Sequence, residues 1–136
     1  MQVPDFLLRK LYRKGSLRET GDGRFAFALR NVLGTATVLH PPVIVVNGIG
    51  YRPEQVHATQ AGGAPLPLQA IDERRPWPFA KGAEVTLGFP GRLLRGSNRI
   101  HILVRTKEFG DVEIYVEDKE AEYCDLPGAV PGEGTA

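Results

Sequence analysis

The stretch Ile100-His101-Ile102-Leu103-Val104-Arg105, followed by Val112-Glu113-Ile114-Tyr115-Val116-Glu117, decides the fold class. Every second residue, starting from Ile100 and from Val112, is a large aliphatic one. A period of two places these side chains on one face of a β-strand. Residues 107–111 leave room for a turn, so the sequence predicts an antiparallel hairpin.

Two more hairpins are predicted upstream. Phe25, Phe27 and Leu29 alternate with smaller or charged residues, which predicts a half-buried strand whose partner spans residues 12–18. Residues 19–23 contain two glycines and supply the loop between these strands.

The other hairpin centres on Asn47-Gly48, the dipeptide that favours a type I′ turn. Residues 43–46 are all β-branched and lead into this turn, and residues 49–51 return from it.

Weaker strand patterns bring the expected total to seven to nine, and they cover residues 35–39, 55–59, 66–71 and 84–89. No strand is followed by a long helical pattern, which excludes repeated βαβ units. The sequence therefore predicts an all-β, antiparallel sandwich, immunoglobulin-like or related. Residues 6–14 have one apolar and one basic face, which favours a short N-terminal helix or lead-in strand that caps the core; contact with a membrane surface or a partner is the alternative.

The length of 136 residues suits one domain, which we place at residues 1–124, followed by a flexible Pro/Gly-rich tail at 125–136. There are 17 basic and 16 acidic residues, so no nucleic-acid partner is predicted. No apolar run approaches the roughly 20 residues of a transmembrane segment. The single cysteine, Cys124, and the absence of a secretory signal favour a cytoplasmic location.

Charge is distributed unevenly along the chain. Residues 1–30 carry seven basic and three acidic groups (+4), residues 31–106 carry eight and four (+4), and residues 107–136 carry two and nine (−7). Pairing between adjacent strands is the interpretation we favour, and an acidic docking surface for a partner is the alternative.

The usual signatures of catalysis do not occur. His40, His57 and His101 have no second ligand at metal-binding spacing, so we expect no metal site. Neither Ser16 nor Ser97 lies in a nucleophile-elbow pattern, and no glycine-rich loop opens a helix as a phosphate site requires. We therefore expect no cofactor, and a binding module rather than an enzyme.

The most distinctive segment, residues 72–82, contains the only tryptophan between two prolines. Rigid aromatic residues beside arginines are typical of binding sites, and a second arginine-rich loop covers residues 91–99. We predict a site for a small anionic or sugar ligand, or for a protein partner, built from Arg74, Arg75, Trp77, Phe79, Arg92 and Arg95. The alternative is that both aromatic rings plug one end of the sandwich; exposure of Trp77 distinguishes the two.

The opening residues 3–12, then Lys14-Gly15-Ser16-Leu17, Phe27 and Leu29-Arg30-Asn31, resemble a family of small prokaryotic all-β proteins. Some members of that family carry a hydroxymethylglutaryl-CoA reductase label. The resemblance is clearest over residues 3–60 and implies a fold. It implies no mechanism, because neither a catalytic motif of that enzyme nor a nicotinamide-binding pattern occurs in this chain.

Two other classes of function stay open from the sequence. The chain is a structural, homo-oligomerising subunit if strand edges or the apolar N-terminal segment form an interface. It is a small enzyme if distant strands bring His57, His101 and Asp111 together.

Overall fold

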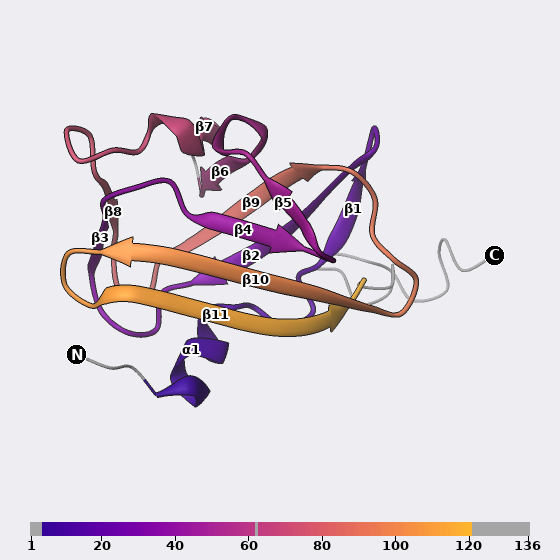
Figure 1. Cartoon of the computed structure of the whole chain (residues 1–136), viewed down its shortest axis with the longest axis horizontal. Helices are drawn as coiled ribbons and strands as arrows, with labels where there is room; N and C mark the ends of the chain where they lie inside the picture. Colours follow the sequence, from indigo (N-terminus) through magenta and orange to yellow (C-terminus); the bar gives the residue numbers. More distant parts are fainter. Residues whose placement is uncertain (1–3, 62, 121–136) are drawn as a thin grey trace.

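The computed structural model describes residues 4–61 and 63–120, and these form two antiparallel sheets packed face to face with one short helix beside them (Figure 1). The predicted tail at residues 125–136 and Cys124 lie outside the described residues. The elements are α1 (Asp5–Leu11), β1 (Arg18–Gly21), β2 (Arg24–Arg30), β3 (Ala36–Val38), β4 (Val43–Val46), β5 (Ile49–Tyr51), β6 (His57–Gln60), β7 (Leu66–Pro67), β8 (Trp77–Phe79), β9 (Glu84–Pro90), β10 (Ser97–Thr106) and β11 (Gly110–Lys119), with 3-10 turns at Pro53–Gln55 and Leu68–Ala70.

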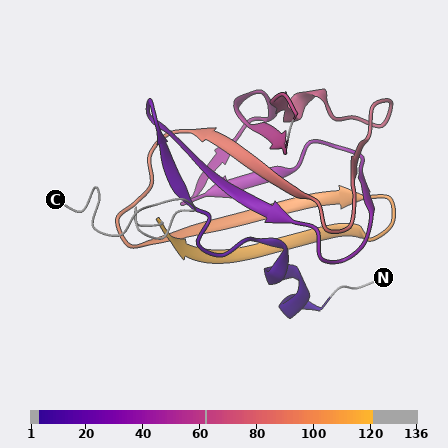
Figure 2. The same cartoon turned by 180° about the vertical axis from the view of Figure 1, so that it is seen from behind.

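Sheet A has the strand order β1-β2-β9-β6-β7. Sheet B has the order β5-β4-β10-β3-β8, with β11 on the other side of β10. Every strand pairing among the described residues is antiparallel, which confirms the all-β sandwich. Sheet B faces the viewer in Figure 1, and β2 and β9 of sheet A cross the front of Figure 2.

The three hairpins predicted from periodicity are present. β10 and β11 pair over their full ten residues, from Ser97 opposite Lys119 to Thr106 opposite Gly110. Asn47 and Gly48 both have positive φ, 53° and 79°, as a type I′ turn between β4 and β5 requires. The predicted pairing of acidic and basic residues also occurs, because Asp111 of β11 lies 3.1 Å from Arg105 of β10.

The predicted strand at residues 12–18 is wrong in extent. Only Tyr12 forms a bridge, with Leu29, and β1 begins at Arg18. Between them the Ser16 hydroxyl accepts the Ala28 amide hydrogen, so a side chain replaces a backbone strand partner. The hairpin turn is also shorter than the predicted loop, because Asp22 and Gly23 both adopt positive φ and reverse the chain in two residues.

Prolines account for two further differences. The predicted strand at residues 66–71 becomes the two-residue β7 and a 3-10 turn, since Pro67 has no amide hydrogen to continue a ladder. β8 lies in a segment that was predicted to be a loop. It pairs only with β3 among the described residues, so it is an edge strand. An edge strand can contain a proline such as Pro78, because the missing amide hydrogen is not needed for a second ladder. Short strands such as these bring the number of strands within residues 4–61 and 63–120 to eleven, where seven to nine were predicted.

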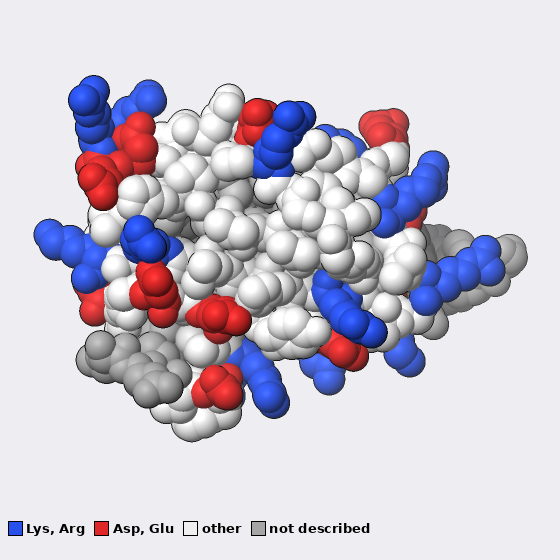
Figure 3. All heavy atoms as spheres, viewed as in Figure 1, with Lys and Arg blue, Asp and Glu red and all other residues white. Residues whose placement is uncertain are grey.

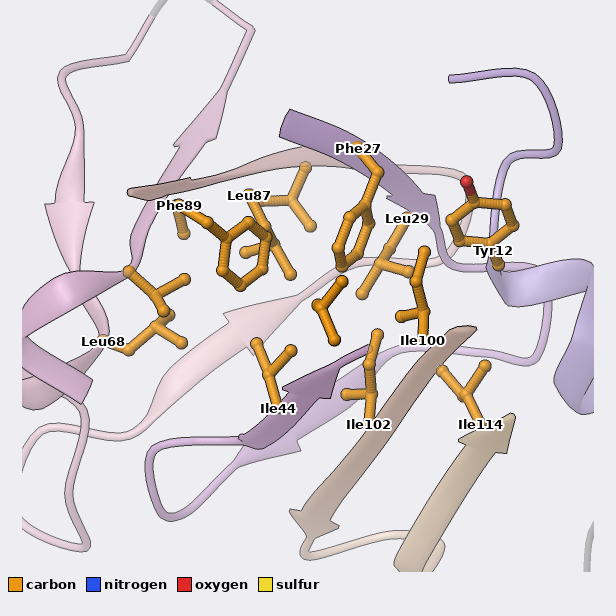
Figure 4. Packing of buried hydrophobic residues seen from close by; sticks show 14 of the residues in the cluster. Tyr12, Phe27, Leu29, Ile44, Leu68, Leu87, Phe89, Ile100, Ile102 and Ile114 are labelled. Carbon is orange, nitrogen blue, oxygen red and sulfur yellow. The ribbon is translucent and has the colours of Figure 1, made fainter. Parts of the chain in front are cut away.

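The core lies between the sheets, where the alternating apolar residues of both meet (Figure 4). Phe25 and Phe27 of β2 stack on Phe89 of β9, with ring centroids 5.0 and 5.1 Å apart. Ile100 and Ile102 of β10 are fully buried opposite them. The helix α1 contacts β11 and β2, with Leu11 buried, and so caps the core as predicted. No helix among residues 4–61 and 63–120 has the length and apolarity that a membrane crossing requires.

Candidate functional site

The predicted site residues fall at two ends of the sandwich. Trp77 and Phe79 lie on β8, which pairs with β3 beside Thr106, the last residue of β10. Arg92 and Arg95 lie in the loop that precedes Ser97, the first residue of the same strand. Ten extended residues span about 33 Å. The structure therefore does not bring the two arginine-rich loops together.

The rings of Trp77 and Phe79 stack on each other, with centroids 5.0 Å apart, and both pack half-buried against the core. They line a partly open cavity of about 80 Å³ whose walls are apolar apart from Asn31 and Thr106. This is about half the volume of a roughly 150 Å³ apolar cavity that binds benzene. This geometry favours the plug interpretation.

Arg74 and Arg75 remain at the surface. Arg75 lies 4.0 Å from the Asp72 carboxylate, which also accepts the backbone amides of both arginines. The Asp72 side chain therefore holds the loop in place through three contacts, and the Trp77 ring near the arginines is half-buried against the core.

The three histidines do not converge. His57 lies on the outer face of sheet A, because its neighbour Ala58 is buried between the sheets. His101 lies on the outer face of sheet B, 2.8 Å from Glu113. His40 contacts Glu73 in a loop, at 3.3 Å. The enzyme hypothesis built on His57, His101 and Asp111 is therefore wrong, because the first two side chains occupy opposite faces of the sandwich.

A different set of polar side chains does converge, in a shallow hollow of about 450 Å³ on the outer face of sheet A. Its lining consists of Arg24, His57, Thr59, Pro65, Thr86 and Gly88. These residues come mainly from β2, β9 and β6, three adjacent strands in the middle of the sheet (Figure 2). A site built on strands holds its groups more precisely than one built on loops.

Strand register explains the hollow. Ala26, Gly88 and His57 lie in one cross-strand row, and Ala28, Thr86 and Thr59 lie in the next. Directly opposed residues share a face of the sheet, so Gly88, which has no side chain, forms the floor of the hollow, with His57, Thr86 and Thr59 around it. A Cβ atom on Gly88 would lie 3.9 Å from Nη2 of Arg24, which places the guanidinium beside this glycine.

The lining of the hollow includes no carboxylate. The guanidinium is permanently charged and offers five N–H donors, the two hydroxyls offer one each, and the imidazole offers one or two. Within the described part of the chain, the Arg24 side chain takes part in no ion pair, whereas Arg13, at the edge of the same sheet, pairs with Glu84 at 3.0 Å. The hollow is thus a concave, donor-rich surface that suits an anion.

Sequence reasoning missed this hollow because its residues are spread from position 24 to position 88 and carry no motif. A weak signal existed in Gly88, which lies inside the strongly alternating strand β9. A glycine within a strand often marks a close approach by another group.

Two buried asparagines were also missed, and their role is structural. The Asn31 amide donates to the Gly34 and Phe79 carbonyls and accepts from the Leu33 and Gly34 amides. Asn98 is fully buried; its side-chain amide donates to the Leu94 carbonyl and accepts from the Leu94 amide. Both side chains use their whole hydrogen-bonding capacity within the fold, which excludes them from ligand binding.

Comparison with known proteins gives one family. The family described as hydroxymethylglutaryl-CoA reductase, N-terminal domain, matches residues 7–120, which run from within α1 to just beyond the end of β11. No curated protein matches the chain. The matched region includes every strand of both sheets and all six residues that line the hollow.

Proposed function

The chain belongs to the family of the hydroxymethylglutaryl-CoA reductase N-terminal domain, a non-catalytic domain, and on that premise we propose that it is a binding module that holds an anionic group in the hollow on sheet A. The observation that carries this proposal is the convergence of Arg24, His57 and two threonine side chains around Gly88. A reducing, cytoplasmic location forms part of the same proposal.

The chemistry of the lining favours an anion over a neutral sugar. Guanidinium groups recognise carboxylates and phosphates through charge-assisted hydrogen bonds, and these are roughly twice as strong as neutral ones. Sugar sites usually add an aromatic platform, and no aromatic ring lines the hollow. The end that carries Trp77 and Phe79 supports ligand binding less well, because both rings pack against the core.

Phosphate is the anion to test first. The family description names an enzyme of a CoA thioester, and CoA carries a phosphomonoester and a diphosphate. Both groups present several oxygens to donors, as the hollow offers. Carboxylates share this chemistry in weaker form, so acetate distinguishes a general anion site from a phosphate site.

The test is isothermal titration of the full chain with inorganic phosphate, pyrophosphate, CoA, acetate and glucose. We expect binding of the phosphate compounds and none of glucose. Arg24→Gln removes the charge but keeps most of the side-chain length, and we expect it to weaken binding at least about 10-fold. The matched control is Arg95→Gln, an exposed arginine outside the hollow.

A second variant tests the floor of the hollow. Gly88→Ala meets only ordinary van der Waals contacts, at 3.9 Å and beyond, so the fold is expected to accept it. The added methyl group occupies space beside the guanidinium and is expected to weaken binding without a change in thermal stability. Failure of every anion to bind the unmodified chain would overturn the proposal, as would equal losses in Arg24→Gln and Arg95→Gln.

A further inference from the structure

The outer face of sheet B is unusually apolar for a surface that contacts water. An antiparallel sheet of a sandwich normally alternates apolar inward and polar outward residues. Here Val43 of β4 and Tyr115 of β11 are 58% and 55% exposed. Val45 and Leu103 lie between them on the same face and are half-buried. In Figure 3 uncharged side chains occupy the middle of this face and charged side chains lie mainly around it.

Cross-strand register shows how compact this patch is. Val45, His101 and Tyr115 form one row across β4, β10 and β11, and Val43, Leu103 and Glu113 form the next. Gly50 of β5 extends the first row without a side chain. The two rows are adjacent, so Val43, Val45 and Leu103 are neighbours, and Tyr115 lies across His101 from Val45. Grouped exposed apolar side chains are typical of interaction sites.

The charges on the same face form two columns. Arg99, His101 and Arg105 are outward residues of β10, and Glu117, Glu113 and Asp111 are outward residues of β11. Arg99 lies opposite Glu117 and Arg105 lies opposite Asp111 in the pairing of the two strands. A column with two arginines and His101 therefore runs beside a column with three carboxylates, which ends in Lys119 opposite Ser97.

We propose that this face pairs with the same face of a second copy of the chain. The two copies are related by a two-fold axis that runs parallel to β10 and β11, outside the sheet and above the strip between these strands. Rotation about this axis turns one face onto the other and exchanges the positions of the two strands. The acidic column of each copy then lies over the basic column of the other. The surface is complementary to itself, as an isologous interface requires.

This arrangement also places specific side chains opposite one another. Arg99 faces Glu117 of the second copy, Arg105 faces its Asp111, His101 faces its Tyr115 and Leu103 faces its Glu113. Val43 and Val45 of β4 lie to one side of the axis and flank this contact. Within one chain the His101 and Tyr115 rings already lie 5.8 Å apart, so the two copies would assemble four rings at the centre. Aromatic groups at the centre with charged pairs at the rim are the usual anatomy of a specific interface.

A differently composed partner fits less well. A strongly acidic or basic protein would meet one favourable and one repulsive column, because the two columns have opposite signs. The hollow on sheet A lies on the other side of the sandwich, so pairing leaves the proposed anion site accessible. The proposal therefore does not depend on the proposed function.

The test is sedimentation equilibrium of the full chain over about 1 μM to 1 mM, a range that covers weak and specific complexes. We expect the mass to rise from one copy to two. Tyr115→Glu introduces a charge at the centre and is expected to weaken pairing at least about 30-fold. Leu94→Glu is the matched control, because Leu94 is also 55% exposed but lies in the β9–β10 loop.

Charge reversal tests the axis itself. Arg99→Glu places two carboxylates opposite each other across the proposed interface, and we expect pairing to be lost. The double variant Arg99→Glu/Glu117→Arg restores opposite charges and is expected to recover pairing. A single-copy mass at every concentration would overturn the proposal. A two-copy mass that Tyr115→Glu weakens no more than Leu94→Glu does would also overturn it, and would assign the contact to another surface.

Discussion

A single carboxylate, that of Asp118, joins the N-terminal segment to the last strand. Its Oδ2 accepts a hydrogen bond from the Tyr12 hydroxyl at 2.7 Å and another from the Gly15 amide at 2.9 Å. Tyr12 is buried, and its ring contacts Phe27 with centroids 5.6 Å apart. The pKa of the Tyr12 hydroxyl is raised well above its ordinary value of 10.0. Burial is the largest cause, and the hydrogen bond and the charge of Asp118 add to it.

We predict that Tyr12→Phe lowers the free energy of unfolding by about 1 kcal/mol, because the ring still packs but Asp118 loses a donor. Urea denaturation at neutral pH measures the change. Tyr51→Phe is the control, since the Tyr51 hydroxyl makes no side-chain hydrogen bond within the described residues; it should change stability less. Equal losses in both variants would show that the bond to Asp118 contributes nothing.

The same group makes a prediction about alkaline pH. Because the folded pKa of Tyr12 is raised, its contribution to stability is complete below the ordinary value of 10.0 and is lost as pH rises above that value. Stability of the unmodified chain should therefore fall above about pH 10 more steeply than that of Tyr12→Phe. Urea denaturation between pH 8 and pH 11 measures both slopes. Parallel slopes would contradict the raised pKa.

Buried Asn98 is the second residue with a large expected effect. Its side chain donates to the Leu94 and Gly96 carbonyls and accepts from the Leu94 amide and from Asn47. We predict that Asn98→Ala costs about 2–3 kcal/mol, because it leaves several polar groups without partners. Ser97→Ala, one residue away and exposed, should cost far less. Hydrogen exchange at the Leu94 amide should become faster in Asn98→Ala alone.

At the scale of elements, β3 and β4 follow one another along the same edge of β10. Val38 lies opposite Thr106, and Val43 lies opposite Leu103. Residues 39–42, with Pro41 and Pro42, interrupt the ladder between them. The short β3 is held by Glu108 in the β10–β11 turn, which accepts from the Thr37 amide at 2.7 Å and from its hydroxyl at 2.9 Å.

These two hydrogen bonds from Thr37 lower the pKa of Glu108 below its ordinary value of 4.5. A lowered folded pKa gives stability that is present above the ordinary value and is lost as pH falls through the lowered one. We predict that Glu108→Gln is less stable than the unmodified chain at pH 7 and that the difference disappears at acidic pH. Thermal unfolding from pH 7 to pH 2 measures it.

A double-mutant cycle tests the cause. The effects of Glu108→Gln and Thr37→Val should be less than additive at pH 7, because each removes part of the same contact. Strict additivity would place the origin of the effect elsewhere.

At the scale of the whole molecule, the two sheets do not fill the space between them completely. The cavity of about 80 Å³ near Trp77 and Phe79 is bordered by Ala58 of β6, whose side chain is buried. Interiors are otherwise close-packed, and an unfilled apolar volume costs stability through lost contacts. The cavity therefore identifies a position where the fold can be stabilised.

We predict that Ala58→Val raises the free energy of unfolding by about 0.5–1 kcal/mol, since its two methyl groups fill part of the cavity and valine favours strands. Scanning calorimetry should show a melting temperature higher by a few degrees. Ala80→Val, at an exposed position, is the control and should have little effect. A lower melting temperature for Ala58→Val would mean that the cavity walls cannot accept the larger side chain.

Local patterns in the chain were enough to predict the fold class and the three hairpins. Alternation at Ile100, Ile102 and Val104 and the Asn47-Gly48 turn are local signals, because the period of a strand and the dihedral angles of a turn depend on neighbouring residues. The short β8 was hidden because Pro76 and Pro78 read as loop, and only pairing with β3 makes a strand there.

The polar residues that meet in space could not be predicted in this way. Arg92 and Arg95 share a composition with Arg74 and Arg75, yet the length of β10 separates the two loops. Arg24, His57 and Thr86 share no motif, yet the register of β2, β9 and β6 brings them together around Gly88. The physical reason is that strand order and register are set by packing between distant segments, and no local pattern in the chain encodes them.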